Sequence, residues 1–321
     1  MSNVYVNYLL RWSEMPKSLA YFKGKVVPIS DANINIMTHA LHYGTAIFEG
    51  IRGNWNESEQ KLYVFKLKEH YQRLLQGCKI MMMDIPYSVD DLCEITINLL
   101  KETKHKQDVY IRPIAYKSEE LVANLKLHEI EDDFNLIVIP FGAYLDTEGT
   151  IRCTTSSWRR MEDTNVPPRI KVSGNYVNSI LAKTAAVLAG FDEAILLNGN
   201  GVVSEGSGEN LFLVINNELH TPELSDNILT GITRDSIKTI AQNDLKIPVI
   251  ERRINRSEIY LADEMFLTGT AAHVTAVGEL DNRTIGSGSI GPVTKQIQKI
   301  YSKAIRGQDP KYLNWCTACE Y

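Results

Sequence analysis

The chain has 321 residues, of which 44% are hydrophobic and 23% charged, and its formal net charge is −5. This length is enough for one large domain or two packed domains with a substantial core. Acidic and basic residues are mixed, and no lysine and arginine cluster is dense enough to follow a phosphate backbone, which excludes nucleic acid as a partner. No apolar run reaches the roughly 18 residues that a membrane helix needs, and the N-terminus lacks the pattern of a signal peptide. We therefore expect a soluble, cytoplasmic protein with no membrane partner.

The five cysteines are an odd and scattered set, which argues against a disulfide framework. Cys316 and Cys319 have C-x-x-C spacing, but no second such pair or pair of histidines completes the four ligands of a zinc site. His39 and His42 are close in sequence, yet no carboxylate accompanies them at a spacing suited to a metal. We expect no metal site and interpret both histidines as structural.

Hydrophobic periodicity predicts the elements of the first half of the chain. Alternating patterns predict strands at 61–65, 109–115 and 135–140, and helical patterns predict helices at 68–82 and 89–101. This mixture is typical of an α/β architecture.

Residues 141–150 carry two glycines and acidic residues between a predicted strand and the next apolar run, which indicates a domain junction. The predicted organisation is a small N-terminal domain at 1–140, an interdomain loop at 141–150 and a larger domain at 151–321. In the larger domain the patterns predict a strand at 151–156, a helix at 177–189, hairpin turns at 198–201 and 216–218, and helices at 233–243 and 292–305.

Lys171 lies in the segment P-P-R-I-K-V-S-G-N-Y, between two prolines and a Ser-Gly-Asn run. A lysine taken at random is usually a solvated surface residue, but these neighbours indicate a constrained loop. A lysine amine forms a Schiff base with an aldehyde cofactor when desolvation leaves it partly deprotonated. The run S-E-G-S-G-E-N-L-F at 204–212 then supplies two acids, Glu205 and Glu209. The two segments together suggest a buried lysine and acid around a cofactor.

Two glycine-threonine turns, T-G-I-T at 230–233 and T-G-T-A at 268–271, add a second clue. The first opens a predicted helix, where free backbone N–H groups, the helix dipole and a hydroxyl converge on an anion. A threonine at a helix start is more often a plain N-cap, so either turn alone is weak. Pyridoxal phosphate needs these parts: an amine for its aldehyde, donors for its phosphate, and a carboxylate for its pyridine nitrogen.

Seven segments in order along the chain resemble the branched-chain amino acid aminotransferases, a group of fold type IV pyridoxal-phosphate enzymes. They are H-A-L-H-Y-G-T-A-I-F-E-G-I-R (39–52), Y-I-R-P (110–113), G-N-Y (174–176), S-E-G-S-G-E-N-L-F (204–212), T-G-I-T-R-D (230–235), Y-L-A-D-E (260–264) and T-G-T-A-A (268–272). The resemblance covers about 39–300. It implies an α/β (α+β) chain with a small N-terminal α/β domain, a larger pseudo-barrel C-terminal domain, and an active site between them that a second subunit completes. The expected assembly is thus a homodimer or a higher homo-oligomer.

The resemblance implies a cofactor site for pyridoxal 5′-phosphate. Lys171 is then the lysine that bonds the aldehyde, Tyr176 contacts the phenolic oxygen, and Glu205 holds the pyridine nitrogen. Glu209 is the rival acid, which we interpret as structural. The groups implied to bind the phosphate are Arg73, Ile232, Thr233, Gly269 and Thr270. From helix periodicity alone, Arg73 would be a surface residue.

The resemblance also implies a substrate site. Phe48 and Tyr43 would wall an apolar pocket for Leu, Ile and Val side chains, although any one aromatic taken singly is more often a core residue. Tyr110 and Arg112 would recognise carboxylates, and Arg112 would reach the second carboxylate of glutamate. The remaining implied contacts are Tyr144, Thr270 and Ala271.

The predicted function is transamination of branched-chain L-amino acids with 2-oxoglutarate, giving branched-chain 2-oxo acids and L-glutamate. Alternatives with the same fold are a D-amino acid or (R)-amine transaminase and an aminodeoxychorismate lyase. A non-catalytic pyridoxal-phosphate-binding protein is the alternative from another class. The segments at 39–52 and 110–113 favour the branched-chain enzyme, and the lysine, acid and phosphate groups favour catalysis.

Overall fold

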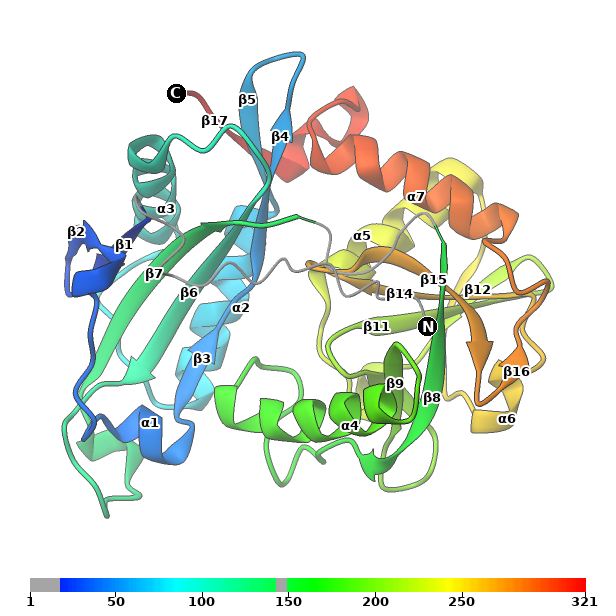
Figure 1. Ribbon diagram of the computed structural model, residues 1–321, viewed down its shortest axis with the longest axis horizontal. Helices are drawn as coiled ribbons and strands as arrows, with labels where there is room; N and C mark the ends of the chain where they lie inside the picture. Colours follow the sequence, from blue (N-terminus) through cyan, green and yellow to red (C-terminus); the bar gives the residue numbers. More distant parts are fainter. Residues whose placement is uncertain (1–17, 143–148) are drawn as a thin grey trace. The chain divides into compact units, whose positions relative to one another are not determined.

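The computed structural model describes residues 18–142 and 149–321. These residues form two compact units, one of 18–142 together with Ile305–Tyr321, and one of 149–304. Both units combine helices with a sheet (Figure 1). None of the helices in the described ranges is long and apolar enough to cross a membrane.

The first unit contains an antiparallel sheet in the order β17-β5-β4-β6-β7-β1-β2, with β3 also paired to β6. Its strands are β1 (Leu19–Phe22), β2 (Lys25–Pro28), β3 (Ala46–Phe48), β4 (Ile51–Asn56), β5 (Lys61–Phe65), β6 (Val109–Lys117), β7 (Asp132–Pro140) and β17 (Cys316–Cys319). The strands predicted at 61–65, 109–115 and 135–140 are confirmed as β5, β6 and β7.

Two long helices pack against each other and against this sheet. The helices of the unit are α1 (His39–Tyr43), α2 (Leu67–Ile80) and α3 (Val89–Thr103), with short 3-10 helices at Ile29–Asp31, Leu127–Glu129 and Pro310–Trp315. A capping box fixes the start of α3: the Ser88 side chain accepts from the Asp91 backbone N–H, and the Asp91 side chain accepts from the Ser88 backbone N–H. Leu92, Leu99 and Leu100 form its buried stripe.

The C-terminal segment differs from the sequence-based division, which placed it in the domain 151–321. Strand β17 pairs antiparallel with β5, so it completes the sheet of the first unit. Strand pairing between segments some 250 residues apart leaves no local pattern in the sequence. Because side chains alternate along a strand, Cys316 and Cys319, three positions apart, project to opposite faces of the sheet. Their C-x-x-C spacing therefore does not bring the two thiols together.

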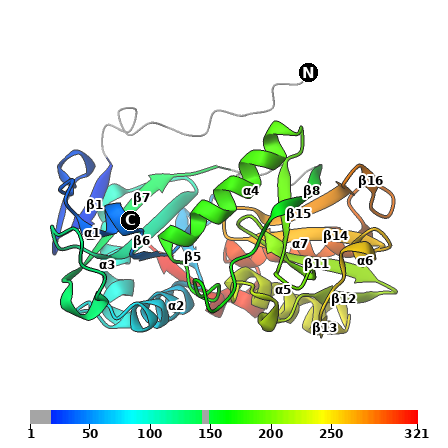
Figure 2. The same cartoon turned by 90° about the horizontal axis from the view of Figure 1, so that it is seen from below.

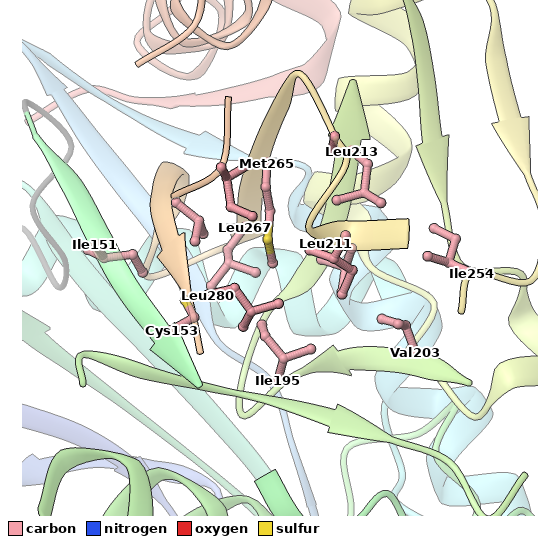
Figure 3. Close-up of a cluster of buried hydrophobic side chains, with 14 of the residues drawn as sticks. Ile151, Cys153, Ile195, Val203, Leu211, Leu213, Ile254, Met265, Leu267 and Leu280 are labelled. Atoms are coloured by element: carbon pink, nitrogen blue, oxygen red, sulfur yellow. The ribbon is translucent and has the colours of Figure 1, made fainter. Parts of the chain in front are cut away.

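The second unit contains a mixed sheet in the order β10-β9-β8-β15-β14-β11-β12-β13, with β16 paired to β15. Its strands are β8 (Thr150–Arg159), β9 (Glu193–Leu197), β10 (Val203–Gly206), β11 (Asn210–Ile215), β12 (Glu218–Thr221), β13 (Val249–Glu251), β14 (Glu264–Gly269), β15 (His273–Leu280) and β16 (Arg283–Thr284). The pairs β8–β9, β8–β15 and β12–β13 are parallel. Buried aliphatic side chains from several strands, among them Leu211, Met265 and Leu267, form the core (Figure 3).

The helices of the second unit are α4 (Tyr176–Leu188), α5 (Ile232–Ile240), α6 (Arg256–Ile259) and α7 (Pro292–Ile305), with shorter helical turns at η4 (Ser173–Asn175), η5 (Leu224–Asp226) and η6 (Ala241–Leu245). Helix α4 packs against β8 and β9, and Figure 2 shows it beside β8. The small residues Ala182 and Ala186 allow its close approach to Ala194 and Leu196. The helices predicted at 177–189 and 292–305 are confirmed, and so is the turn at 216–218, where Asn216 and Asn217 have the positive φ that a tight hairpin requires.

Candidate functional site

Lys171 and Tyr176 are joined by a direct contact in the second unit. Lys171 Nζ donates a hydrogen bond of 2.8 Å to the Tyr176 hydroxyl. Lys171 precedes the turn η4, and Tyr176 is the first residue of α4. Both side chains are half-buried. An amine and a phenol are therefore held together at the start of a helix that packs against two strands.

Glu205 is a buried carboxylate with three donors. Its Oε2 atom accepts hydrogen bonds from Asn210 Nδ2 at 2.9 Å and from the Leu229 backbone N–H at 3.0 Å. Its Oε1 atom lies 2.6 Å from Arg160 Nη2. Burial raises the pKa of Glu205 above its ordinary value, and Arg160, the Leu229 N–H and the charge of Lys171 offset this effect only in part. The effect of Lys171 means that this lysine lies near the carboxylate, as expected for one site.

Glu209, the rival acid, has different surroundings. Burial and the negative charge of Glu193 raise the pKa of Glu209 to about 8, although Lys183 and the Gly208 N–H oppose them. Lys183 makes its own short ion pair with Glu193 at 2.6 Å. Glu209 therefore lies in a second buried group of acids, and it favours the protonated form around neutral pH.

The two glycine-threonine turns supply backbone donors. Helix α5 begins at Ile232 with Gly231 as its N-cap, a residue that has no side chain to cap the helix. Its first N–H groups have no partner within the helix. A Cβ atom at Gly231 would collide with Asn210 Oδ1, so any larger residue here would displace the Asn210 amide that donates to Glu205. In the second turn, Thr268 Oγ1 is buried without a hydrogen-bond partner among the described residues. Gly269 and Thr270 follow it at the end of β14, and both are half-buried.

Phe48, Tyr110 and Arg112 form a cluster in the first unit. The guanidinium of Arg112 lies 4.4 Å from the ring centroid of Phe48 and 5.1 Å from that of Tyr110. Arg112 Nη2 also donates to the Tyr110 hydroxyl at 3.0 Å. The Tyr110 hydroxyl occupies the space that a side chain at Gly50 would need. These contacts hold Arg112 between two aromatic rings.

Arg73 is buried in α2, so the surface position that helix periodicity suggests is wrong. Its Nε and Nη2 atoms each lie 2.7 Å from an oxygen of Glu49, in a bidentate pair. His70 Nδ1 is 2.7 Å from Glu49 Oε2. Burial raises the pKa of Glu49, but Arg73 and His70 outweigh it and hold that pKa well below its ordinary value. A pattern of apolar residues cannot show that a cation is buried with its counterion.

The other predicted residues are less informative. Tyr43 is exposed on α1, and its hydroxyl accepts from the Ala123 N–H at 2.9 Å. His39 is buried, with hydrogen bonds of 2.8 Å to Thr45 Oγ1 and to the Asn124 carbonyl, so its structural interpretation is supported. Ala271 is half-buried. Tyr144 lies outside the described residues.

Residues 46–280 match the family model described as Amino-transferase class IV. The chain belongs to the class IV aminotransferases.

Proteins similar to this class IV aminotransferase align over nearly all of its length. A probable branched-chain-amino-acid aminotransferase of Aquifex aeolicus (strain VF5) is 51% identical over 298 residues, covering 93% of this chain and 96% of that protein. The crystal structure of the branched-chain aminotransferase from Thermoproteus uzoniensis with norvaline has a TM-score of 0.90 at 40% identity and covers 94% of this chain and 100% of that one. The structure of the Thermobaculum terrenum enzyme in its PLP form has a TM-score of 0.90 at 36% identity, with coverage of 95% and 99%. The predicted fold type is confirmed.

Sequence reasoning missed three charged or polar residues of this aminotransferase. Glu49 and Asn210 stand inside the segments 39–52 and 204–212, so their place in those segments was an available signal. Arg160 carries no such signal, because only the folded chain places it against Glu205.

Proposed function

We propose that this class IV aminotransferase transfers the amino group of branched-chain L-amino acids (Leu, Ile and Val) to 2-oxoglutarate, with pyridoxal 5′-phosphate as cofactor. The products are branched-chain 2-oxo acids and L-glutamate. The similarity to branched-chain aminotransferases over more than nine tenths of the chain supports this substrate class. The observation that carries the proposal is the hydrogen-bonded pair of Lys171 and Tyr176 near the ionisable Glu205.

The chemistry of the donor set fits pyridoxal phosphate. Lys171 offers an amine for the aldehyde, Tyr176 a phenol for the ring oxygen, and Glu205 a carboxylate for the pyridine nitrogen. Two further features fit a phosphate: the uncapped start of α5 at Ile232 and Thr233, and the orphaned hydroxyl of Thr268 beside Gly269 and Thr270. We assign Arg73, held by Glu49, to the same phosphate.

When bound, the cofactor supplies an electron sink that makes the Cα proton of the substrate acidic. Lys171 Nζ takes that proton from Cα, as a base, and later returns a proton, as an acid. Tyr176 orients Nζ through its hydroxyl. Glu205 keeps a negative charge available for a protonated ring nitrogen, and that charge is the property on which the electron sink depends.

We assign substrate recognition to the cluster of Phe48, Tyr110 and Arg112. Phe48 is an apolar wall that suits a branched aliphatic side chain, and Arg112 is a fixed cation that suits the γ-carboxylate of glutamate. The side-chain contacts assigned to Tyr43, Tyr144, Thr270 and Ala271 belong to the same proposal. The norvaline bound to the Thermoproteus uzoniensis enzyme supports recognition of an apolar side chain.

We also propose that the protein is a homodimer. The solvent-exposed face of α4 is largely apolar, with residues spaced at three and four positions along the helix: Val177, Ile180, Leu181, Thr184, Ala185 and Leu188. Ile180 is 60% and Leu188 84% exposed in the single chain. A contiguous apolar stripe of this kind on a soluble chain favours a partner surface, and the family resemblance favours a second copy. Location in the cytoplasm stays a prediction.

A substrate panel tests the proposed activity. The purified protein, loaded with pyridoxal phosphate, is given L-leucine with 2-oxoglutarate, and in parallel D-alanine or (R)-1-phenylethylamine as donors. We expect L-glutamate to form from L-leucine with ping-pong kinetics. Lys171→Ala should lose turnover and keep its cooperative unfolding transition, whereas Lys295→Ala, which changes an exposed lysine of α7, should behave like the parent. Faster turnover of D-alanine or the amine than of L-leucine would overturn the substrate assignment.

A further inference from the structure

Arg160 is a buried arginine that the proposed mechanism leaves without a role. It follows β8, and its backbone N–H donates to the Leu197 carbonyl at 2.9 Å. Its side chain is 8% exposed. One guanidinium nitrogen, Nη1, donates to Ser179 Oγ at 3.3 Å, and the other, Nη2, lies 2.6 Å from Glu205 Oε1. The guanidinium thus connects the inner face of α4 to the carboxylate on β10.

The hydrogen bonds of Glu205 distinguish its two oxygens. A carboxylate has about four lone-pair sites, two on each oxygen. Oε2 already accepts from Asn210 Nδ2 and from the Leu229 N–H. Among residues 18–142 and 149–321, Oε1 accepts from Arg160, and this contact leaves one of its lone-pair sites unused.

We propose that Arg160 is a positioning residue that keeps Glu205 ionised and fixes its Oε1 atom as the oxygen for the pyridine nitrogen of the cofactor. Only the identity of the cofactor atom rests on the proposed function. The control of the charge of Glu205 by Arg160 concerns the chain itself.

The charges around Glu205 explain why Arg160 is needed. Burial disfavours the ionised form of Glu205. The charge of Glu205 also raises the pKa of Glu209, so the two acids do not favour being ionised together. Arg160 and Lys171 are the cations that act in the opposite direction. Lys171 is also the amine that must give up its positive charge to act as a base. An arginine stays charged at every pH at which the protein is folded. Arg160, and not Lys171, therefore supplies a permanent positive charge beside Glu205.

Carboxyl NMR of the cofactor-free full-length chain tests the charge control directly. Glutamate labelled with carbon-13 at its side-chain carboxyl is incorporated, and the Glu205 resonance is identified by its absence in Glu205→Gln. In Arg160→Gln the carboxyl should titrate at higher pH than in the parent. Arg159→Gln, which removes the exposed arginine next to it, should leave the titration unchanged. An unchanged titration of Glu205 in folded Arg160→Gln would overturn the proposal.

Arg160→Lys separates charge from geometry and provides a variant that keeps a cation if the glutamine variant does not fold. An ammonium cannot reproduce the two-directional contact of Arg160 with Ser179 and Glu205. We expect Glu205 to stay ionised in this variant. The kcat of the cofactor-loaded enzyme should fall about tenfold with KM little changed, because a displaced carboxylate affects the transition state more than substrate binding. Parent-like kcat in Arg160→Lys would refute the positioning role, and a raised titration there would refute the charge role. If the NMR result holds and the parent transaminates none of the panel, the proposed function fails and the control of Glu205 stands.

Discussion

The hydrogen bond from Lys171 Nζ to the Tyr176 hydroxyl, 2.8 Å long, spans the single turn η4 between the lysine and α4. The tyrosine side is rigid, because α4 packs on β8 and β9 through its buried alanines. The rigid helix α4 therefore orients the flexible Lys171 side chain through Tyr176. A base needs such a fixed position to accept a proton from a bound substrate.

Tyr176→Phe should leave the Lys171 amine in the site but remove the hydroxyl that orients it. We expect kcat with L-leucine to fall roughly tenfold to a hundredfold, the equivalent of losing one hydrogen bond to a charged or partly charged group. The measurement is steady-state kinetics, with thermal unfolding as the check on folding. A variant that keeps the parent kcat would show that α4 does not orient the lysine through this hydroxyl.

The two acids of the run 204–212 should differ in their effect on the rate. Arg160 and two further donors contact Glu205 and oppose the effect of burial on its pKa, whereas Glu209 lies in the field of Glu193, whose negative charge adds to the effect of burial. Glu205→Gln should therefore lower kcat far more than Glu209→Gln, because a neutral amide cannot stabilise a positive ring nitrogen in a buried site. The two variants are compared at one pH with saturating cofactor. The reverse order would transfer the role to Glu209.

Arg112→Leu should weaken the binding of glutamate and 2-oxoglutarate by about 2–5 kcal/mol, the range for breaking a buried charge pair. The binding of leucine should be weakened much less, since leucine has no γ-carboxylate. Both amino acids share the α-carboxylate, so the ratio of their kcat/KM values cancels any loss through that group. Equal losses would mean that Arg112 serves the α-carboxylate or only supports Tyr110 and Phe48, on which its guanidinium lies.

The free energy of unfolding of the cofactor-free protein should decrease as pH rises, because of Glu209. Its folded-state pKa is raised to about 8, whereas an unfolded glutamate titrates near about 4.3. Below that lower value both states hold the proton. As pH rises from about 4 to about 8, the unfolded state releases the proton and the folded state retains it, so the free energy of unfolding decreases.

Glu209→Gln removes this titration. We therefore expect the difference in Tm between Glu209→Gln and the parent to shift in favour of the variant between pH 5 and pH 8. The exposed Glu94→Gln serves as the control and should give a difference that is constant with pH. Parallel Tm profiles for Glu209→Gln and the parent would contradict the assignment of this buried proton.

Ile180→Lys should disrupt the proposed homodimer, because it places a charge in the middle of the exposed apolar stripe of α4. Sedimentation velocity should show a monomer for this variant and a dimer for the parent. Leu261→Lys is the matched control, since Leu261 is 82% exposed outside that stripe. If the parent is itself a monomer, or if Ile180→Lys remains a dimer, the proposal that α4 forms a dimer interface is wrong.

The sequence by itself determined the local elements and the types of chemical group. Strand β5 at Lys61–Phe65 and helix α7 at Pro292–Ile305 have the bounds that their periodicity predicts, because a side-chain period of two or 3.6 is a property of neighbouring residues. The same holds for the turn at Asn216 and Asn217. The lysine, the acids and the glycine-threonine turns could be found because each lies in a short constrained segment.

Only the tertiary structure decided which of these groups meet. Glu205 and Arg160 are 45 positions apart, Glu49 and Arg73 are 24 apart, and β17 pairs with β5 from the other end of the chain. A buried charge is stable only where a partner from elsewhere in the chain compensates its loss of hydration. That partner is selected by three-dimensional packing, and no pattern among neighbouring residues specifies it.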